Sequence, residues 1–352
     1  MDWLRVFGIV LLFPFHTARV FDHWEPNYIK DSPNWFSSWF VLGTAFWFMP
    51  LMFLVAGFSC CHALHRRTAG EYMRERVSRL LIPLLAGTVL IVPIQGYVAR
   101  IQQFAYTGTY LSFLGSCFTD FSDLSGYRGT FTPGHLWFLL YLFAISVCLL
   151  PVLRRINAIE QHRLENLKKP ALVLFAFIPL TIMEALPGVG GKNPFYYAAF
   201  FLLGYLIARV EGLLDALRVF RFKTLLAVAV AVPAFLLFGV SFGWPSGFTA
   251  PAIVAALLRN LAAWLVLVTL LGFADMHLNK PSSALNTLNR AAFPVYVLHQ
   301  SVMMVVAFFV VAWNIPAALK FTLILCATLA LSLLGFELSR RFKITRLMLG
   351  IK

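Results

Sequence analysis

Charged residues are scarce in this sequence. Asp, Glu, Lys and Arg make up 12% of its 352 residues, and the mean hydropathy is +0.78. A soluble domain usually has about 25% charged residues, because its surface faces water. The composition therefore excludes a soluble domain and indicates an all-α integral membrane protein, with the lipid bilayer as a partner.

Several motifs that define enzyme classes are also missing. The five cysteines are scattered, four of them within apolar runs, so neither a disulfide framework nor a metal-binding spacing is visible. We expect no metal site. The sequence has no nucleotide-binding glycine loop, no Gly-x-Ser-x-Gly elbow and no paired-carboxylate spacing. A hydrolase or a kinase therefore has no support.

Long apolar runs are abundant instead. About ten of them are long enough to cross the roughly 30 Å of hydrocarbon in a bilayer. They lie at about 3–21, 38–64, 82–103, 135–153, 171–186, 195–212, 224–242, 250–274, 291–313 and 317–338. The first run has no small-residue cleavage site, so we expect it to remain as a helix. The predicted fold is one bundle of about ten transmembrane helices over residues 1–352.

The formal net charge of +14 has to be interpreted by side of the membrane. With a cytoplasmic N-terminus, the outer loops hold only Lys30, Arg100, Arg128 and Lys192, and most other basic residues fall in inner segments. This asymmetry satisfies the positive-inside rule, so we predict that both termini are cytoplasmic in a multi-pass protein of the cell membrane. The charge reflects topology, and no nucleic-acid partner is expected.

The first apolar run, 3–21, carries two ionisable residues, Arg5 and His16. Eleven residues apart, they lie on one face of a helix, about 16 Å from each other along its axis. An ionisable residue inside a membrane span is costly and indicates a functional site. A histidine at the headgroup layer is the alternative.

The residues around His16 resemble a known family. Asp2-x-x-Arg5 and Pro14-Phe15-His16, with ten residues between the arginine and the histidine, are similar to the first helix of the membrane-bound acyltransferase family 3. In that family an Arg-x10-His pattern carries the catalytic histidine. The Pro-Phe-His form is most similar to the branch that contains glucan biosynthesis protein C.

Four later stretches also resemble this family. Gly57-Phe-Ser59 is similar to its small-residue stretch, with Ala56 in place of the usual serine, and small residues let helices approach closely. The other three stretches are Arg76-x-x-Arg79 before Ile82-Pro83, His135-x-Trp137-Phe-Leu, and Tyr296-x-x-His299. The resemblance implies transfer of an acyl group, acetyl or succinyl, from cytoplasmic acyl-CoA to a carbohydrate or glucan hydroxyl at the outer face.

Three residues are catalytic candidates under this resemblance. A sugar hydroxyl is a poor nucleophile until a base removes its proton, and histidine, with a pKa of about 6.5, suits that task. We assign His16 as general base, with a transient acyl carrier as the alternative. Arg259 and His299 could stabilise the thioester oxyanion or line the pantetheine tunnel, or form a structural network between helices.

The substrates suggest further residues. Arg5, Arg76 and Arg79 could bind the phosphates of the donor, because guanidinium pairs two-pronged with phosphate; basic clusters also bind lipid headgroups. For the acceptor, the candidates are His135, Trp137, Asp22 and Tyr296. Glu184, near the end of an apolar run, is interpreted as a solvated cap residue.

Two other classes of function are compatible with the sequence. A transporter of a glycan or lipid-linked sugar could use Arg259 and His299 as its substrate or proton site. Against it, no matched pairs of Gly/Pro-broken helices are obvious in two halves of the chain. A scaffold or sensor is the third possibility.

The charge asymmetry makes a testable prediction about topology. Single cysteines placed in the segments 22–37 or 104–134 should react with an impermeant thiol reagent added from outside the cell, because both segments are predicted to face out. Labelling is read from intact cells. A failure of both segments to react would overturn this topology.

Overall fold

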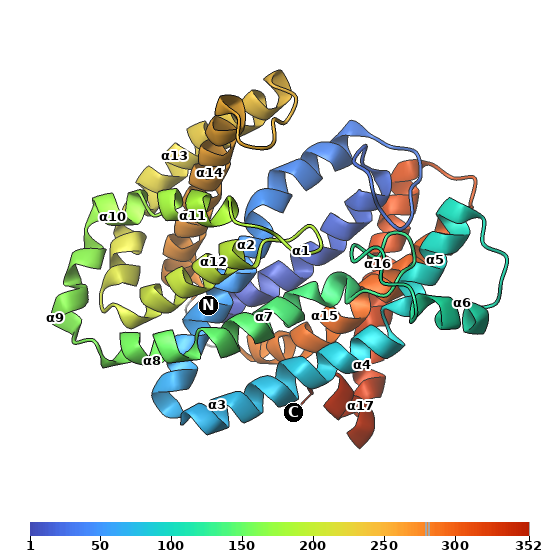
Figure 1. The fold of residues 1–352 in the computed structure, drawn as a ribbon, viewed down its shortest axis with the longest axis horizontal. Coiled ribbons are helices and arrows are strands. Elements are labelled where there is room, and N and C mark those ends of the chain that lie inside the picture. The colour runs from blue at the N-terminus through green and yellow to red at the C-terminus, as the bar shows by residue number, and fades with distance from the viewer. Residues whose placement is uncertain (279, 281, 352) are drawn as a thin grey trace. The chain divides into compact units, whose positions relative to one another are not determined.

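The computed structural model describes residues 1–278, 280 and 282–351 (Figure 1). Within these residues the regular elements are helices, and one isolated bridge joins Val189 and Lys192. The all-α fold predicted from the composition is confirmed.

In the described part of the chain, seven helices are long and apolar enough to cross a membrane. Two further pairs of helices pass the same test but are bent by 51° and 70°, which gives nine spans if each pair crosses once. The predicted span 195–212 corresponds to α12 (Pro194–Arg209), an apolar helix of 16 residues and hence about 24 Å in length. The protein is a multi-pass membrane protein, and the side on which each terminus lies stays a prediction.

The chain forms two compact units. Unit 1 comprises Met1–Arg5, Ala45–Tyr72 and Ile145–Pro281, and unit 2 comprises Val6–Thr44, Met73–Ala144 and Ser282–Lys352. Four helices contain residues of both units: α1 (Asp2–Phe21), α2 (Trp35–Arg66), α3 (Ala69–Arg76) and α7 (Trp137–Cys148). The remaining elements of unit 1 are α8 (Leu150–Ala158), α9 (Gln161–Leu164), η3 (Glu165–Lys168), α10 (Pro170–Leu174), α11 (Phe177–Glu184), α12, α13 (Leu213–Ser241) and α14 (Ala250–His277). Those of unit 2 are η1 (Val77–Leu81), α4 (Ile82–Leu90), α5 (Pro93–Phe104), α6 (Tyr110–Cys117), η2 (Gly134–Leu136), α15 (Ser283–Val310), α16 (Ala317–Ser339) and α17 (Lys343–Met348).

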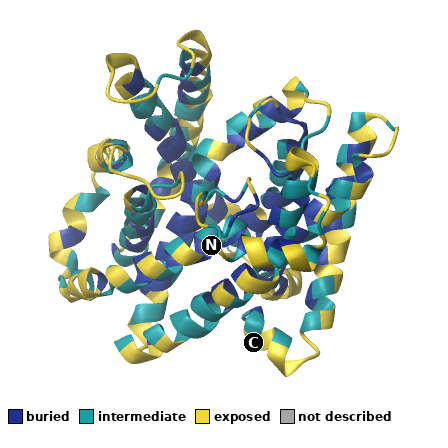
Figure 2. Ribbon diagram, turned by 45° about the vertical axis from the view of Figure 1, so that its right-hand side comes forward, coloured by how far each residue is buried: buried dark blue, intermediate teal, exposed yellow. Residues whose placement is uncertain are grey.

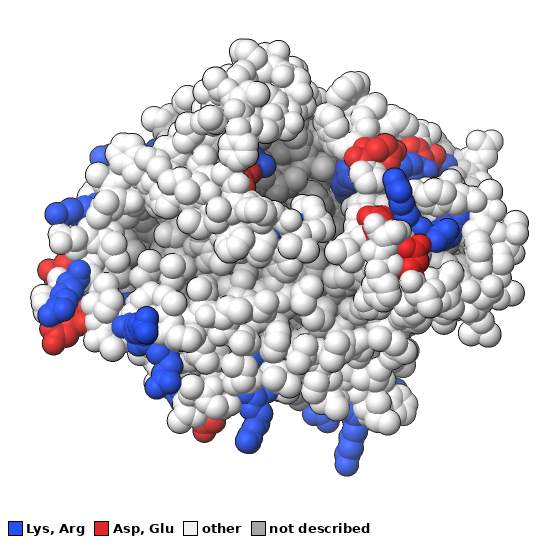
Figure 3. Space-filling model, in the orientation of Figure 1, with Lys and Arg blue, Asp and Glu red and all other residues white. Residues whose placement is uncertain are grey.

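In unit 1, α13 and α14 run side by side (Figure 1). Ala231 and Phe235 of α13 pack there against Ala262 and Leu265 of α14. Other large apolar side chains of α13, such as Leu226, are exposed, whereas positions 255–275 of α14 are buried or intermediate (exposed positions are yellow in Figure 2). Figure 3 shows few charged side chains over most of the visible surface, as lipid contact requires.

Helices α2 and α12 are in backbone contact within unit 1. A Cβ atom added at Gly57 would lie 1.8 Å from the backbone oxygen of Phe201, and one at Gly204 would lie 1.9 Å from that of Leu54. Each glycine therefore faces the backbone of the other helix. The expectation that the small residues near Gly57 allow a close helix approach is confirmed.

In unit 2, α15 packs against α5 and α16, and buried residues of all three helices share one core with the end of α1 (Figure 1). The loop after α1 is fixed to this core by charge pairs. Asp31 accepts a hydrogen bond from Lys320 of α16 at 2.8 Å. Burial alone would raise the pKa of Asp31, but hydrogen bonds from Lys320 and Ser32 outweigh burial and hold this pKa below its ordinary value.

The contact between α2 and α12 predicts that Gly57→Ala is destabilising. The new methyl group overlaps the Phe201 backbone, which cannot move away as a side chain could, so we expect a loss of about 1 to 3 kcal/mol. The melting temperature of the detergent-solubilised protein measures this. Gly70→Ala in α3 is the matched control, since a Cβ there meets no described atom within 4 Å. Equal loss in both variants would contradict the close packing.

Candidate active site

Three histidines from distant parts of the sequence meet inside unit 2. They are His16 of α1, His135 of η2 and His299 of α15. The His299 ring lies in the middle, with its centroid 5.4 Å from that of His16 and 5.3 Å from that of His135. His299 is fully buried, and the ring of Phe13 packs against it at 5.7 Å. The structure thus brings together the three histidines that the sequence proposed separately.

A break between α4 and α5 is linked to this cluster by hydrogen bonds. Pro93 has no N–H, and the Gln95 N–H binds the carbonyl of Val92, so the helical pattern does not use the carbonyl of Ile91. The Ser301 hydroxyl of α15 donates to that carbonyl at 2.8 Å. The break in one helix is therefore satisfied by a side chain from another, which joins α5 to α15.

Gln95 connects this junction to the cluster. Its side chain is fully buried, and its Nε2 donates to Ser301 Oγ and lies 2.8 Å from His135 Nδ1. An amide nitrogen can only donate, so His135 Nδ1 is the acceptor. His135 Nε2 lies 2.9 Å from the Val297 carbonyl, which can only accept, so this nitrogen carries the hydrogen. His135 is thereby fixed as one neutral tautomer with both nitrogens occupied.

His299 is bound on one side only. Its Nδ1 lies 2.5 Å from the backbone oxygen of Tyr296 and therefore carries a hydrogen. Its Nε2 is buried and has no hydrogen-bond partner among the described residues. In the neutral ring this nitrogen is a lone-pair acceptor, which cannot donate to an oxyanion.

His16 has neither nitrogen engaged in a hydrogen bond within the described part of the chain. Its ring contacts are with Phe15, at 5.3 Å between centroids, and with His299. It is half-buried, whereas His135 and His299 are buried. Of the three histidines, His16 is the least enclosed and the one whose two ring nitrogens have no hydrogen-bond partner among the described residues.

The residues expected to bind the acceptor are placed differently. The Tyr296 hydroxyl donates to the backbone oxygen of His135 at 2.6 Å, so Tyr296 supports the cluster. The Asp22 carboxylate is enclosed and paired with Arg19 and Lys30. Trp137 stands at the start of α7, with its ring 5.6 Å from that of Tyr141.

Arg259 lies in unit 1, on α14. It forms an ion pair with Glu184 at the end of α11, and Asn260 donates to the same carboxylate at 2.5 Å. Arg259, expected to face a polar interior, has this carboxylate as its partner, and its own side chain is 37% exposed. The interpretation of Glu184 as a solvated cap residue is wrong: its side chain is 19% exposed and neutralises the arginine, because an unpaired charge in a membrane span is costly.

The three arginines expected at the donor site have acidic neighbours. In unit 1, Arg5 binds Asp2 at 2.8 Å and Ser59 at 2.7 Å. In unit 2, Arg76 and Arg79 share Glu75, at 3.8 and 3.4 Å.

A π-helical turn follows directly after Arg76 and contains Arg79. Pro83 has no N–H that could donate to the carbonyl of Arg79. The N–H of Ile82 donates to the carbonyl of Val77, five residues earlier, where an α-helix would use the carbonyl four residues earlier. This turn lies just before the predicted run 82–103 and leads into α4.

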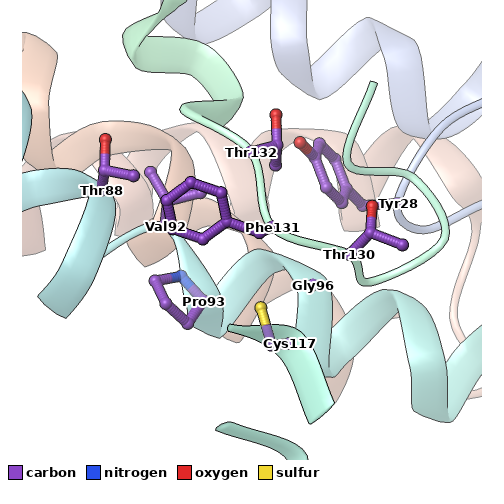
Figure 4. A pocket seen from close by; sticks show the side chains of 9 residues that line it. All are labelled: Tyr28, Thr88, Val92, Pro93, Gly96, Cys117, Thr130, Phe131 and Thr132. Carbon is purple, nitrogen blue, oxygen red and sulfur yellow. The ribbon is translucent and has the colours of Figure 1, made fainter. Parts of the chain in front are cut away.

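One small pocket in unit 2 lies beside the α4–α5 break, with a volume of about 10 Å³, roughly what one water molecule needs. Figure 4 shows Tyr28 and Thr132 next to each other in its wall, from the loops after α1 and α6. Burial raises the pKa of the Cys117 thiol in the same wall, so this group is uncharged at neutral pH. The pocket is neutral and fits water, not a sugar or an acyl chain.

Sequence reasoning missed Gln95 and Ser301. A usable signal was present for Gln95, since a glutamine two residues after a proline in an apolar run must find buried partners. Serine at position 301 gave no such signal, because serine is tolerated in membrane helices by bonding to its own backbone. Among the described residues, no three His, Cys, Asp or Glu side chains converge as metal ligands would.

The fold defines a polytopic membrane protein, and three histidines meet inside its unit 2. Residues 1–337 match the family described as acyltransferase domain, so the chain belongs to the acyltransferase family 3 and is an acyltransferase. No curated protein matches the chain, and no solved structure does. The family resemblance seen in the sequence is confirmed, and its branch stays a prediction.

Proposed function

We propose that this acyltransferase moves an acetyl or succinyl group from cytoplasmic acyl-CoA to a hydroxyl of a carbohydrate, such as a glucan, at the outer face of the membrane. The observation that carries this proposal is the histidine cluster of unit 2, in which His16 alone has both ring nitrogens uncommitted. The Pro14-Phe15-His16 sequence supports the glucan acceptor.

His16 acts as the general base in this proposal. It removes the proton of the acceptor hydroxyl while the oxygen attacks the thioester carbonyl. The new C–O bond forms, the C–S bond breaks, and the proton passes from His16 to the departing CoA sulfur. The products are the acyl ester and CoA with a free thiol. Neutral histidine suits this cycle because it takes up and releases a proton near neutral pH.

The other candidate residues receive supporting roles. Arg76 and Arg79 bind the phosphates of the donor in competition with Glu75. Arg5 stays a candidate for the same donor, and Trp137 for the acceptor. Asp22, Tyr296 and His135 support the structure of unit 2, and Arg259 that of unit 1, because their polar groups already have partners within the fold. The family match favours this enzyme over a transporter or a scaffold.

Replacing His16 tests the catalytic assignment. His16→Ala and His16→Asn should both lower acyl transfer about 100-fold or more, the usual contribution of a positioned base, since neither side chain can take up the proton. Binding of acyl-CoA, measured by calorimetry, should stay close to that of the wild type. Transfer is measured with radiolabelled acyl-CoA and purified protein in liposomes.

His62→Asn provides the matched control, since His62 is exposed on α2 and bonds only locally to the Phe58 carbonyl. It should transfer at the wild-type rate. Near-normal turnover by His16→Asn would remove His16 from the mechanism.

The arginines before α4 are tested through the donor. Arg76→Ala and Arg79→Ala should each raise the Michaelis constant for acyl-CoA about tenfold, because lost charged hydrogen bonds weaken ground-state binding. Steady-state rates at varied acyl-CoA concentration measure this. Arg74→Ala is the control for general basic charge, as Arg74 is exposed in the same segment. An equal effect of all three variants would indicate that the segment only holds lipid headgroups.

A further inference from the structure

The ring of His299 presents one bound nitrogen and one open nitrogen. We infer that His299 is a positioning residue whose Nε2 accepts the N–H of His16, so that the other nitrogen of His16 is bare and faces the acceptor hydroxyl. This inference rests on the proposed function of His16 as the base. It gives His299 a role different from stabilising the thioester oxyanion.

The hydrogen-bond pattern around His299 defines its tautomer. A backbone carbonyl accepts and never donates, so the contact of Nδ1 with the Tyr296 oxygen at 2.5 Å places the hydrogen on Nδ1. A second hydrogen on Nε2 would make a cation in a fully buried ring, without a described partner. Such a cation is strongly disfavoured. Nε2 is therefore a bare acceptor that needs a donor.

Among the three histidines, only His16 can supply that donor. Both nitrogens of His135 are occupied, one by Gln95 and one by the Val297 carbonyl. The His16 ring lies 5.4 Å from that of His299, measured between centroids. Two imidazole rings joined by an N–H···N bond have centroids about 5 Å apart. Catalytic hydrogen bonds are often loose without substrate and shorten when it binds, so a small rotation of His16 completes the pair.

The ring of His135 limits how the ring of His299 can turn. The ring of His135 stands edge-on to it, with an interplanar angle of 89°. His135 is in turn fixed by Gln95, whose amide also binds Ser301 at the α4–α5 break. A chain of hydrogen bonds thus runs from the helix break to His135, and the His135 ring packs against the ring of His299. It leaves His299 little freedom to turn its Nε2 away.

The pairing helps the reaction at the step where charge appears. When His16 takes the hydroxyl proton it becomes an imidazolium, and its N–H bond to the neutral His299 Nε2 strengthens because the donor is now charged. Before that step, the same bond selects the tautomer of His16 with a bare nitrogen toward the substrate. A buried carboxylate could do this too, but it would place a negative charge in the membrane interior.

Two substitutions at position 299 separate an acceptor from a space-filling role. Glutamine places an amide oxygen near the position of Nε2 and can accept from His16, whereas leucine cannot accept. His299→Leu should lower kcat about 100-fold or more while the Michaelis constant for acyl-CoA stays within about threefold of wild type. His299→Gln should recover kcat to within about tenfold of wild type. A glutamine variant as slow as the leucine variant, or a leucine variant with wild-type kcat, would overturn the inference.

The wild-type protein supplies a second measurement that does not depend on folding of a variant. In protein labelled with ¹⁵N-histidine, His299 should show the neutral tautomer with hydrogen on Nδ1, and a coupling across the hydrogen bond should connect its Nε2 to a His16 nitrogen. Hydrogen on Nε2 of His299 would overturn the inference. Absence of acyl transfer by the wild type would instead count against the proposed function, and the two failures are therefore distinguishable.

Discussion

The hydrogen bond between Gln95 and His135 is the interaction on which the arrangement of unit 2 depends. Inside a membrane protein, a buried polar group without a partner costs about 1 to 3 kcal/mol, and water is scarce as a substitute. Gln95 provides a donor to His135 and to Ser301 with the two hydrogens of one amide nitrogen. The same bond sets the tautomer of His135, whose ring packs against that of His299. One amide group therefore joins the α4–α5 break to the histidine cluster.

Charges follow the same constraint. Arg259 is neutralised by Glu184 in unit 1, and Asp31 by Lys320 in unit 2. Asp22 is enclosed between two cations. Within this set of buried charges each has an opposite partner, whereas the histidines are held by neutral contacts.

The spans were predictable because hydrophobic length is a local property. The runs 250–274 and 317–338 correspond to α14 and α16, which extend a few residues beyond them. Where the sequence suggested one helix over 82–103, the structure has α4 and α5, because Pro93 has no N–H and the Gln95 N–H binds the carbonyl of Val92 rather than that of Ile91. The proline was visible in the sequence, but the serine that satisfies the break lies 210 positions away.

The sequence by itself determined the membrane class and the family, since each rests on composition or on short motifs. It also predicted His16 and His299 as site residues. Only the tertiary structure decided which partners the candidate residues have. His135 and Tyr296, expected at the acceptor, are committed to partners in other helices, and Glu184, expected in solvent, is paired with Arg259. The reason is physical: a hydrogen-bond role belongs to both partners, and Gln95 and Ser301, which fix these roles, are 206 positions apart in the chain and 2.8 Å apart in the fold.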